Sequence, residues 1–295
     1  MYKAYPQTLA YTVAIDAPGS GAYRTMAKLL AGSLARTRFS GEFIIFRNTH
    51  APIFQVPRTG IVEIELQLPR ANDSAEQVEQ GWTMKYRVRD LVQEQIAATG
   101  ASVVLFIDSD SIVLRNIDYL LDGHEWHIQY FAEPGRAIQN NVFNCFLTDA
   151  EMGTPHQSTG YPPRHPPSLS TCALGREGIN SGTWAVKAPH YHRMMQEWER
   201  IDSGPVTRKR QFSEQAAWNR LVLDARANGW RARPFERDAI QCPLLMHPQW
   251  QDYTEASLVH CVGGTTEQKL KFMFGLYMST FYWDDTASFI HLLEA

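Results

Sequence analysis

The clearest hydrophobic pattern in the chain is an uninterrupted apolar run over residues 103–107. Its β-branched residues and its Phe favour a strand buried on both faces, like the strands in the middle of a parallel α/β sheet. The run leads directly into Asp108, Ser109 and Asp110. Because residues two apart in an extended strand point to the same side, we expect both carboxylates to face one point.

Two carboxylates at the end of a buried strand favour a metal site. Ligands of open α/β sheets bind beyond the carboxyl ends of the strands, and hard oxygen ligands suit Mg²⁺ or Mn²⁺ ions that also hold substrate phosphates. The alternative is a solvated turn, in which Asp and Ser are both common. A second apolar run at residues 112–114 follows the acids at once, and a solvated turn does not account for it. The pattern therefore predicts that Asp108 and Asp110 bind a divalent ion.

Strand and helix patterns alternate before this run. Residues 11–16 and 42–46 are predicted strands with an amphipathic helix between them, and residues 61–66 suggest a third, shorter strand. The turn-rich segment 17–21 lacks the sequences G-K-S/T and G-x-G-x-x-G that are typical of phosphate-binding loops. The chain therefore opens as a β-α-β unit, the start of a nucleotide-binding half-sheet.

A long helix is predicted from a capping-box sequence at Ser74 to Thr99, with Gly81 as the candidate point of interruption. Lys85 and Arg89 lie on one face of it, on a stripe that apolar residues continue. A lysine on such a stripe more often extends its ammonium group into water than contacts a ligand. The pattern leaves both interpretations of Lys85 open.

Two short polar sequences in the second half of the chain can contact a ligand. Asn180 and Ser181 offer groups that hold a sugar hydroxyl, and Gly182 lets a ligand approach the backbone. Glu214 and Gln215 fall in the first turn of a predicted helix. That position suits structural acids, because the helix dipole favours them there, and it also suits residues that point into a site.

Residues 134–178 interrupt the alternation of elements. They are rich in Pro and Gly, so little regular structure is expected, and loops of this length are usually lids, binding loops or disordered segments. A ligand-binding loop and a mobile surface insertion are equally good interpretations. Before residues 134–178 we expect a strand at residues 126–131, and after them we expect helices over residues 189–201 and 214–228.

The last strand pattern, residues 257–264, contains His260. A lone histidine in an apolar strand is more often a hydrogen-bonded core residue than a metal ligand. Residues 268–283 of the closing segment are rich in aromatic side chains. We expect them to join the core, with a face for a partner or a membrane surface as the alternative.

Composition narrows the class of protein. The 295 residues suffice for one large α/β domain or two small ones, and the net charge of −3 gives no reason to expect a nucleic-acid partner. No apolar stretch approaches the ~20 residues of a membrane helix, and residues 1–30 lack the pattern of a signal peptide. The four cysteines form no C-x-x-C pair, which favours a reducing cytoplasm over a zinc site or a disulfide scaffold. We therefore expect a cytoplasmic protein.

Taken in order, these patterns resemble the GT-A glycosyltransferases of the glycogenin and bacterial galactosyltransferase type. The similarity spans roughly residues 10–270, and the D-x-D block with its x-L-x-N-I-D-x-L continuation is its most specific part. The matching features are a basic residue on the helix before the metal strand (Lys85), the D-x-D block (108–110) with its continuation (113–120), N-S-G (180–182), an acid-Gln pair (214–215) and V-H-x-x-G (259–263).

The resemblance implies a Rossmann-like α/β fold of the GT-A, nucleotide-diphospho-sugar transferase type, with a mixed, mostly parallel central sheet. It implies a single catalytic domain over residues 1–295, with 134–178 as an insertion and 265–295 as a closing segment. The implied activity is transfer of a hexose from a UDP-sugar, dependent on Mn²⁺ (or Mg²⁺), with retention of anomeric configuration.

The resemblance also implies roles for individual residues. The implied metal ligands are Asp108, Asp110 and His260. The implied catalytic residues are Gln215, Glu214 and Lys85. The implied donor-binding residues are Asp16, Ala14, Lys85, Asp108, Ser109, Asn180, Ser181, Gly182, Gly263 and Lys269.

Three departures from the family pattern leave choices open. The acid before Gln215 is Glu214 where the family has Asp. Five residues, 264–268, separate V-H-x-x-G from the next lysine, so either Lys269 or Lys271 is the candidate for the diphosphate. The insertion is longer than the family's usual connection, so the acceptor stays open between a saccharide, a peptide and a small molecule, as does homo-oligomerisation.

Two rival functions fit part of the same pattern. The apolar D-x-D sequence is also similar to that of haloacid dehalogenase-type phosphohydrolases, which normally carry it on the first strand, whereas here a β-α-β unit precedes it. A non-catalytic nucleotide-sugar-binding module is the second rival. Assays of UDP release from a UDP-sugar and of p-nitrophenyl phosphate cleavage distinguish the glycosyltransferase, the phosphohydrolase and the non-catalytic module.

Overall fold

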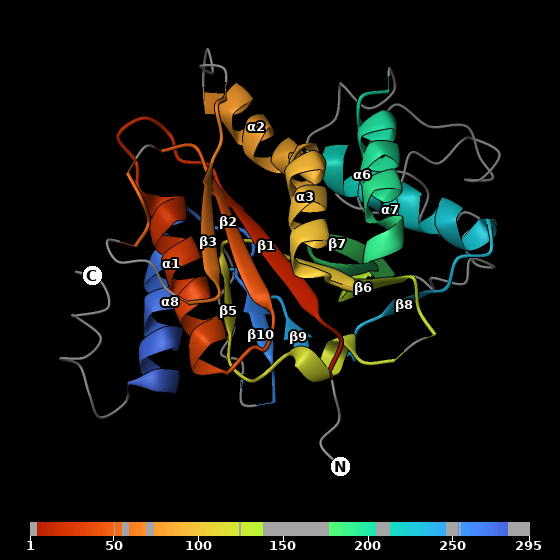
Figure 1. The fold of residues 1–295 in the computed structure, drawn as a ribbon. Coiled ribbons are helices and arrows are strands. Elements are labelled where there is room, and N and C mark those ends of the chain that lie inside the picture. Colours follow the sequence, from red (N-terminus) through yellow and green to blue (C-terminus); the bar gives the residue numbers. More distant parts are fainter. Residues whose placement is uncertain are drawn as a thin grey trace. The chain divides into compact units, whose positions relative to one another are not determined.

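The computed structural model of the chain consists of two compact units (Figure 1). It describes residues 5–49, 51–54, 59–68, 74–123, 125–137, 177–204, 213–245, 253 and 255–282. The first unit comprises Met1–Lys85, Gln95–Asp122 and Asp238–Ala295. The second comprises Tyr86–Glu94 and Gly123–Arg237.

A parallel sheet forms the centre of the first unit. Its strands are β1 (Thr8–Ala14), β2 (Glu42–Arg47), β3 (Ile61–Glu65) and β4 (Val103–Ile107). They pair in the order β3-β2-β1-β4, with every pair parallel. All residues of β1 and β4 are buried, as the uninterrupted apolar run of β4 predicts. The β-α-β opening and the α/β class are therefore confirmed.

A smaller sheet of the first unit joins segments that are far apart in the sequence. It contains β5 (Ser111–Val113), β9 (Ile240–Gln241) and β10 (Leu258–His260). Strand β10 lies in the middle, antiparallel to β5 and parallel to β9. The short helix η1 (Asp118–Leu121) follows β5.

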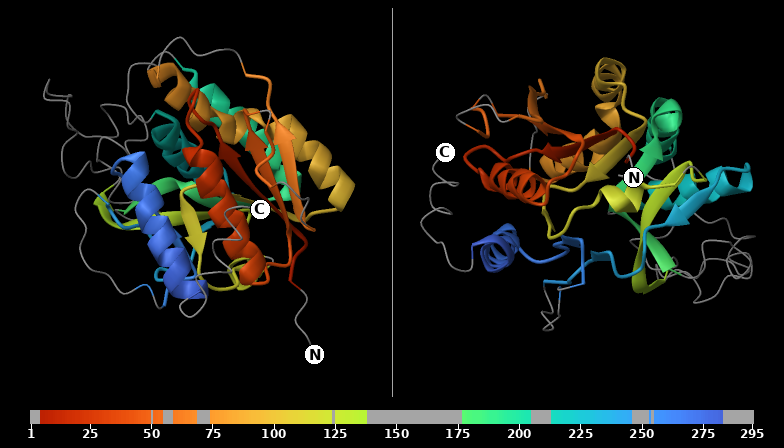
Figure 2. Two further views of the ribbon diagram at one scale, coloured as in Figure 1. Left: turned by 90° about the vertical axis from the view of Figure 1, so that its left-hand side faces the viewer. Right: turned by 60° about the horizontal axis from the view of Figure 1, so that its bottom comes forward.

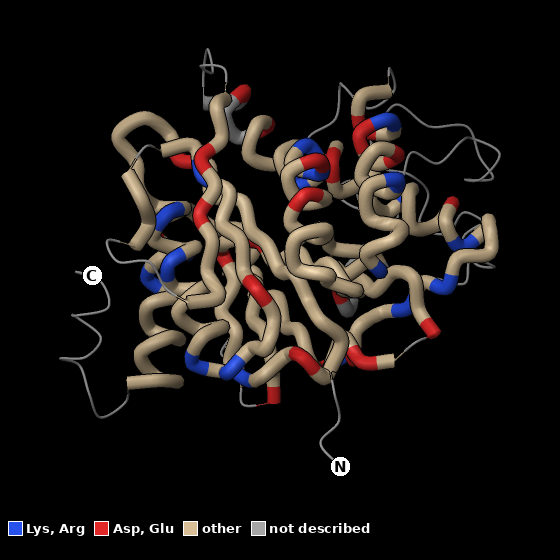
Figure 3. The backbone as a smooth tube through the Cα atoms, viewed as in Figure 1, with Lys and Arg blue, Asp and Glu red and all other residues tan. Residues whose placement is uncertain are grey.

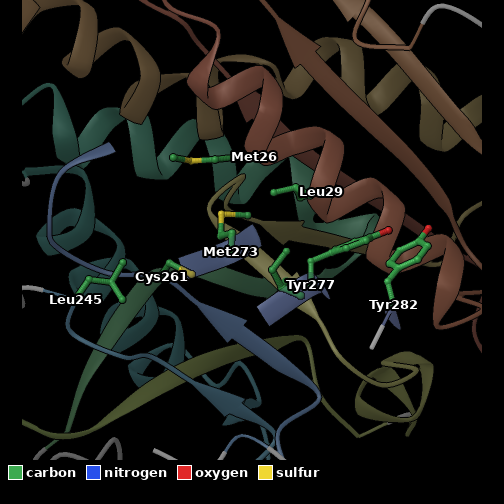
Figure 4. Packing of buried hydrophobic residues seen from close by; sticks show 8 residues of the cluster. Met26, Leu29, Leu245, Cys261, Met273, Tyr277 and Tyr282 are labelled. Carbon is green, nitrogen blue, oxygen red and sulfur yellow. The ribbon is translucent and has the colours of Figure 1, made fainter. Parts of the chain in front are cut away.

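Helices α1 (Ala22–Arg36) and α8 (Thr266–Phe281) lie side by side in the first unit (Figures 1 and 2). Met26 and Leu29 of α1 meet Met273 and Tyr277 of α8 in one buried apolar cluster, which also includes Ile112 of β5 (Figure 4). The expectation that the aromatic closing segment joins the core is confirmed for the described part of α8. Residues 283–295 lie outside the described residues.

The predicted helix from Ser74 to Thr99 is two helices, α2 (Ser74–Arg87) and α3 (Arg89–Thr99), so the interruption falls after Arg87 and not at Gly81. The Tyr11 hydroxyl of β1 donates to the carbonyl of Lys85, in the last turn of α2. The last carbonyls of a helix have no partner within the helix, and this tertiary hydrogen bond supplies one. A pattern of apolar positions carries no sign of such a bond.

The second unit combines a mixed sheet with two helices. Its elements are β6 (Ile128–Ala137), β7 (Glu177–Lys187), α6 (Ala188–Asp202), α7 (Ser213–Ala227) and β8 (Ala232–Pro234). Strand β6 pairs antiparallel with β7 and parallel with β8. Trp198 of α6 and Trp218 of α7 pack against Trp184 of β7, with ring centroids 4.7–5.9 Å apart. Both helices agree with their predicted spans.

The predicted insertion over residues 134–178 begins and ends in regular structure. Strand β6 continues to Ala137, beyond the expected end at residue 131, and pairs there with Glu177 at the start of β7. Residues 138–176 lie outside the described residues. The single catalytic domain over residues 1–295 stays an expectation.

Charged residues of both signs are distributed along the two units (Figure 3). Among the described residues, no helix combines the length and the apolar character that crossing a membrane requires.

Candidate metal centre

Strand pairing in the first unit brings the predicted metal ligands together. Strand β4 ends at Ile107, so Asp108 and Asp110 lie between it and β5. In the antiparallel pair of β5 and β10, Ser111 lies opposite His260. The Cys261 N–H also donates to the Asp110 carbonyl at 2.8 Å. The backbone therefore places the histidine beside the D-x-D sequence.

The three side chains converge on one point. His260 Nε2 lies 3.2 Å from Asp110 Oδ1 and 3.5 Å from Asp108 Oδ2. One ligand atom from each residue falls within 4.8 Å of the others, and the described residues hold no other such group of His, Cys, Asp and Glu. Two carboxylates and an imidazole fit a divalent ion. The nitrogen ligand favours Mn²⁺ over Mg²⁺, which takes oxygen ligands.

His260 is buried in β10, as a core histidine would be, yet its ring is not fully satisfied. Its Nδ1 is buried and has no hydrogen-bond partner among the described residues, whereas Nε2 faces both carboxylates. A metal-binding imidazole offers one nitrogen to the ion, as Nε2 is placed to do here, whereas its other nitrogen usually donates a hydrogen bond, for which Nδ1 has no partner among the described residues. The geometry therefore agrees with the ligand interpretation, which the sequence pattern alone made the weaker one.

Two lysines contact the carboxylates. Lys85 Nζ lies 3.1 Å from Asp108 Oδ2, and Lys269 Nζ lies 2.5 Å from Asp110 Oδ2. Lys85 is only 5% exposed, so its ammonium group does not reach out to water, and that interpretation of the helix stripe was wrong. Lys271 is exposed and pairs with Glu267 at 2.7 Å, one turn along α8. Of the two candidate lysines, the structure thus brings Lys269 to the cluster.

Electrostatics keep the partners of the closest ion pair charged. Burial opposes ionisation of Asp110, but the charge of Lys269 and the adjacent His260 outweigh it and hold the pKa of the carboxyl well below its usual range. Burial likewise opposes the charge on Lys269, but Asp110 raises the pKa of the ammonium group above its ordinary value. A full negative and a full positive charge therefore lie side by side in a buried site.

Tyr23 of α1 is a neighbour of the cluster that the sequence analysis did not identify. Burial raises the pKa of its phenol, Lys269 lowers it, and Asp110 and Asp108 raise it further. The phenol therefore stays protonated. The sequence could have predicted that Tyr23 faces inward, because it precedes the buried Met26 by three residues and so lies on the same helix face.

Asp16 has a structural role that its sequence context did not reveal. Its Oδ1 accepts the Tyr23 N–H at 2.8 Å and its Oδ2 accepts the Arg24 N–H at 3.0 Å. Both oxygens therefore satisfy free N–H groups in the first turn of α1. Ala14 is the buried last residue of β1. Donor binding by either residue stays a prediction.

Ser109 and Gly263 frame the metal centre in the chain. Ser109 is buried between the two acids. Gly263 follows β10 and has a φ of 71°, a left-handed conformation that side chains disfavour. The glycine therefore has a backbone reason to be there, whether or not it also contacts a donor.

The N-S-G sequence of the second unit lies on a bulge of β7. Tyr130 of β6 is paired with Trp184, but the next residue, Phe131, is paired with Asn180. Residues 181–183 therefore have no opposite residue on β6. Bulges of this kind redirect side chains and are frequent next to ligand sites.

The bulge and the start of α7 form a second polar cluster. The Ser181 hydroxyl donates to Glu214 Oε1 at 2.9 Å and approaches Gln215 Oε1 at 3.3 Å. Asn180 Nδ2 donates to Glu133 Oε2 at 3.1 Å. The structure thus brings together four of the five predicted residues of this unit, and the fifth, Gly182, lies next to Ser181 in the chain. It adds Glu133, an acid at the end of an apolar strand pattern that the sequence analysis did not extend far enough to include.

The Asn180 amide is held at both ends, because its Oδ1 also accepts the Gly182 N–H at 2.7 Å. Asn219 of α7 fixes the start of the bulge, with its Oδ1 accepting the Ile179 N–H at 2.8 Å. Within the second unit, the polar groups are therefore ordered before any ligand contacts them.

Comparisons of the chain with protein-family models and with curated proteins returned no match. The functional argument accordingly rests on the chemistry of the two clusters.

Proposed function

We propose that the protein is a metal-dependent glycosyltransferase that moves a hexose from a UDP-sugar to an acceptor. The observation that carries this proposal is the convergence of Asp108, Asp110 and His260 with the buried Lys85 and the half-buried Lys269 in one cluster. Carboxylates and an imidazole bind a divalent ion, and ammonium groups bind phosphate oxygens. A nucleoside diphosphate chelated to a metal ion needs both kinds of group.

The charges of the cluster suit a leaving group that gains negative charge. As the bond to the sugar breaks, charge grows on UDP, and fixed positive groups in a buried site stabilise it strongly. Lys85 and Lys269 supply two such groups. When bound to Asp108, Asp110 and His260, a divalent ion supplies Lewis-acid chemistry toward the diphosphate oxygens.

The polar cluster of the second unit, taken by itself, has the chemistry to bind a hexose. Buried amide, hydroxyl and carboxylate groups match the hydroxyl groups of a sugar, and rejecting the wrong sugar requires such paired polar groups. Asn180, Ser181 and Gly182 keep the donor-binding role that the resemblance implies. Gln215 and Glu214 keep the catalytic role, in a transfer that retains the anomeric configuration.

The decisive experiment is an assay of UDP release from a panel of UDP-sugars, with and without Mn²⁺. We expect release that depends on Mn²⁺ and is lost in Asp110→Ala, which removes one of few ligands of the ion. Asp90→Ala is the matched control, because Asp90 pairs with His192 on the surface, with 73% of its side chain exposed.

The rivals give different results in the same assay. Cleavage of p-nitrophenyl phosphate without UDP release would support the phosphohydrolase. A rise in melting temperature with UDP-sugar and Mn²⁺, but no release with any acceptor, would support the non-catalytic binding module.

A further inference from the structure

Lys85 is held in the first unit at two points, its carbonyl and its ammonium group. The Tyr11 hydroxyl donates to the Lys85 carbonyl at 2.5 Å. The Lys85 ammonium group lies 5.5 Å from the centroid of the Phe106 ring, within the range of a cation–π contact. Its third contact is the ion pair with Asp108.

The bond from Tyr11 meets a specific need of α2. Lys85 is among the last four residues of this helix, whose carbonyls have no partner within the helix. Tyr11 is fully buried in the middle of β1, so water cannot take over the role of its hydroxyl. The hydrogen bond therefore ties the backbone of Lys85 directly to the central sheet.

The two aromatic residues form one support. In the parallel pair of β1 and β4, Tyr11 lies opposite Phe106. Their rings pack edge to face, with centroids 5.0 Å apart and planes at 62°. The ring that holds the backbone of Lys85 thus rests on the ring that lies beneath its ammonium group.

We propose that Tyr11 is a positioning residue for Lys85, acting through the carbonyl bond and through Phe106. This inference rests on the proposed function, since it takes the task of Lys85 to be stabilisation of the departing diphosphate. A lysine is a compact charge on a stem of four flexible carbons, so its placement has to come from its surroundings. Small misplacements of a group near reacting atoms lower rates steeply.

The test is a double-mutant cycle on UDP release. Tyr11→Phe removes only the hydroxyl, and we expect it to lower kcat about tenfold while KM for the donor stays near the wild-type value. In a Lys85→Ala background the same substitution should lower kcat no further, because the residue it positions is gone. Tyr119→Phe is the matched control, since it removes a hydroxyl that bonds to Ser257 at 2.8 Å, outside the cluster.

Two kinetic outcomes would overturn the proposal. Wild-type kcat in Tyr11→Phe would show that the hydroxyl does not matter to Lys85. An equal loss in the presence and absence of Lys85 would show that Tyr11 acts on the fold in general. If Tyr11→Phe does not fold, Phe106→Leu, which keeps the apolar volume and removes the ring, takes its place in the same cycle.

A second measurement separates this inference from the proposed function. The ¹⁵N NMR signal of the Lys85 ammonium group, assigned by its loss in Lys85→Ala, should shift or broaden in Tyr11→Phe but not in Tyr119→Phe. This readout needs no activity. An unchanged signal would refute the positioning role, whereas a changed signal in a protein that releases no UDP would refute the proposed function alone.

Discussion

At the scale of single residues, each carboxylate of the metal centre is bonded to one lysine. Asp108 pairs with Lys85, and Asp110 pairs with Lys269. A divalent ion that binds the same oxygens adds two positive charges where two ammonium groups already lie. A diphosphate brings the negative charge that relieves this repulsion. We therefore expect the ion and UDP to bind cooperatively, each raising the affinity for the other by the same factor.

Lys269→Met should expose this coupling. Removing one ammonium group should raise the affinity for Mn²⁺ alone by on the order of tenfold, since charges about 4 Å apart interact by about 1 kcal/mol even in bulk water. It should weaken binding of UDP at saturating Mn²⁺. Calorimetric titrations measure both effects, and the exposed Lys271 provides the control variant, Lys271→Met. A lower affinity for Mn²⁺ in Lys269→Met would contradict the cooperative scheme.

Residue-level chemistry was predictable where one element carries it. Asp108 and Asp110 follow a buried strand, as predicted, but residues 109 and 110 form a turn, so the strand period of two residues does not account for the placement of their carboxylates. His260 and Lys85 were ambiguous, because their roles depend on contacts with a distant part of the chain. No local pattern tells a buried ammonium group from one that reaches water.

At the scale of elements, the pairing of β5 with β10 holds the metal centre together independently of the side chains. Its register places His260 opposite Ser111 through backbone hydrogen bonds. We expect His260→Ala to lower the affinity for Mn²⁺ strongly, because one of three protein ligands is lost, while the melting temperature changes little. Early melting with unchanged Mn²⁺ affinity would instead identify His260 as a core residue.

The end of α2 in the second unit predicts a response to alkaline pH. Tyr86 donates to Asp202 Oδ2 of α6 at 2.7 Å, and its ring packs on Trp198. Burial, together with the negative charge of Asp202 and this hydrogen bond, raises the pKa of the Tyr86 phenol far above its ordinary value of 10.0. The folded state thus disfavours the ionised phenol.

The sign of the pH dependence follows from this raised pKa. The contribution of Tyr86 to stability is complete below the unfolded-state pKa of 10.0 and is lost as the pH rises through the value of the folded state. Denaturant unfolding of the wild type should therefore show falling stability above pH 10. Tyr86→Phe should be less stable at pH 7 and show a flatter alkaline slope. Equal slopes in the two proteins would refute this assignment.

The presence of a helix or strand was predictable where its own apolar pattern determines it. The residues at which elements end or bulge were not, because they depend on contacts with other parts of the chain. Strand β4 and helices α6 and α7 follow from apolar periodicity and caps. The break after Arg87 lies close to the Lys85 carbonyl, which accepts a hydrogen bond from the Tyr11 hydroxyl of a strand far away in the sequence. The bulge at Asn180 depends on its partner strand β6.

At the scale of the whole molecule, the segment between β6 and β7 offers a clean test of the acceptor site. Ala137 and Glu177 are paired in an antiparallel ladder, so a two-residue Asn-Gly turn in place of residues 138–176 joins ends that already meet. We expect the shortened protein to keep slow Mn²⁺-dependent hydrolysis of the UDP-sugar and to lose transfer to the acceptor.

Melting temperature and UDP affinity are the controls for that variant, since both should stay near the wild-type values. Undiminished transfer after shortening would rule out a role of the segment in binding the acceptor. The composition of the segment indicated a binding loop and a surface insertion equally well, because neither requires a periodic pattern.

The discontinuous first unit has a consequence for how the protein is made. Its three segments contribute Lys85, then Asp108 and Asp110, then His260 and Lys269 to one cluster. On the ribosome, the early strands emerge long before β10 and α8 exist, and domains complete themselves in the order of synthesis. A nascent chain that stops before Leu258 lacks the last two of these residues. The candidate metal centre is therefore assembled only by chains whose translation has passed the start of α8.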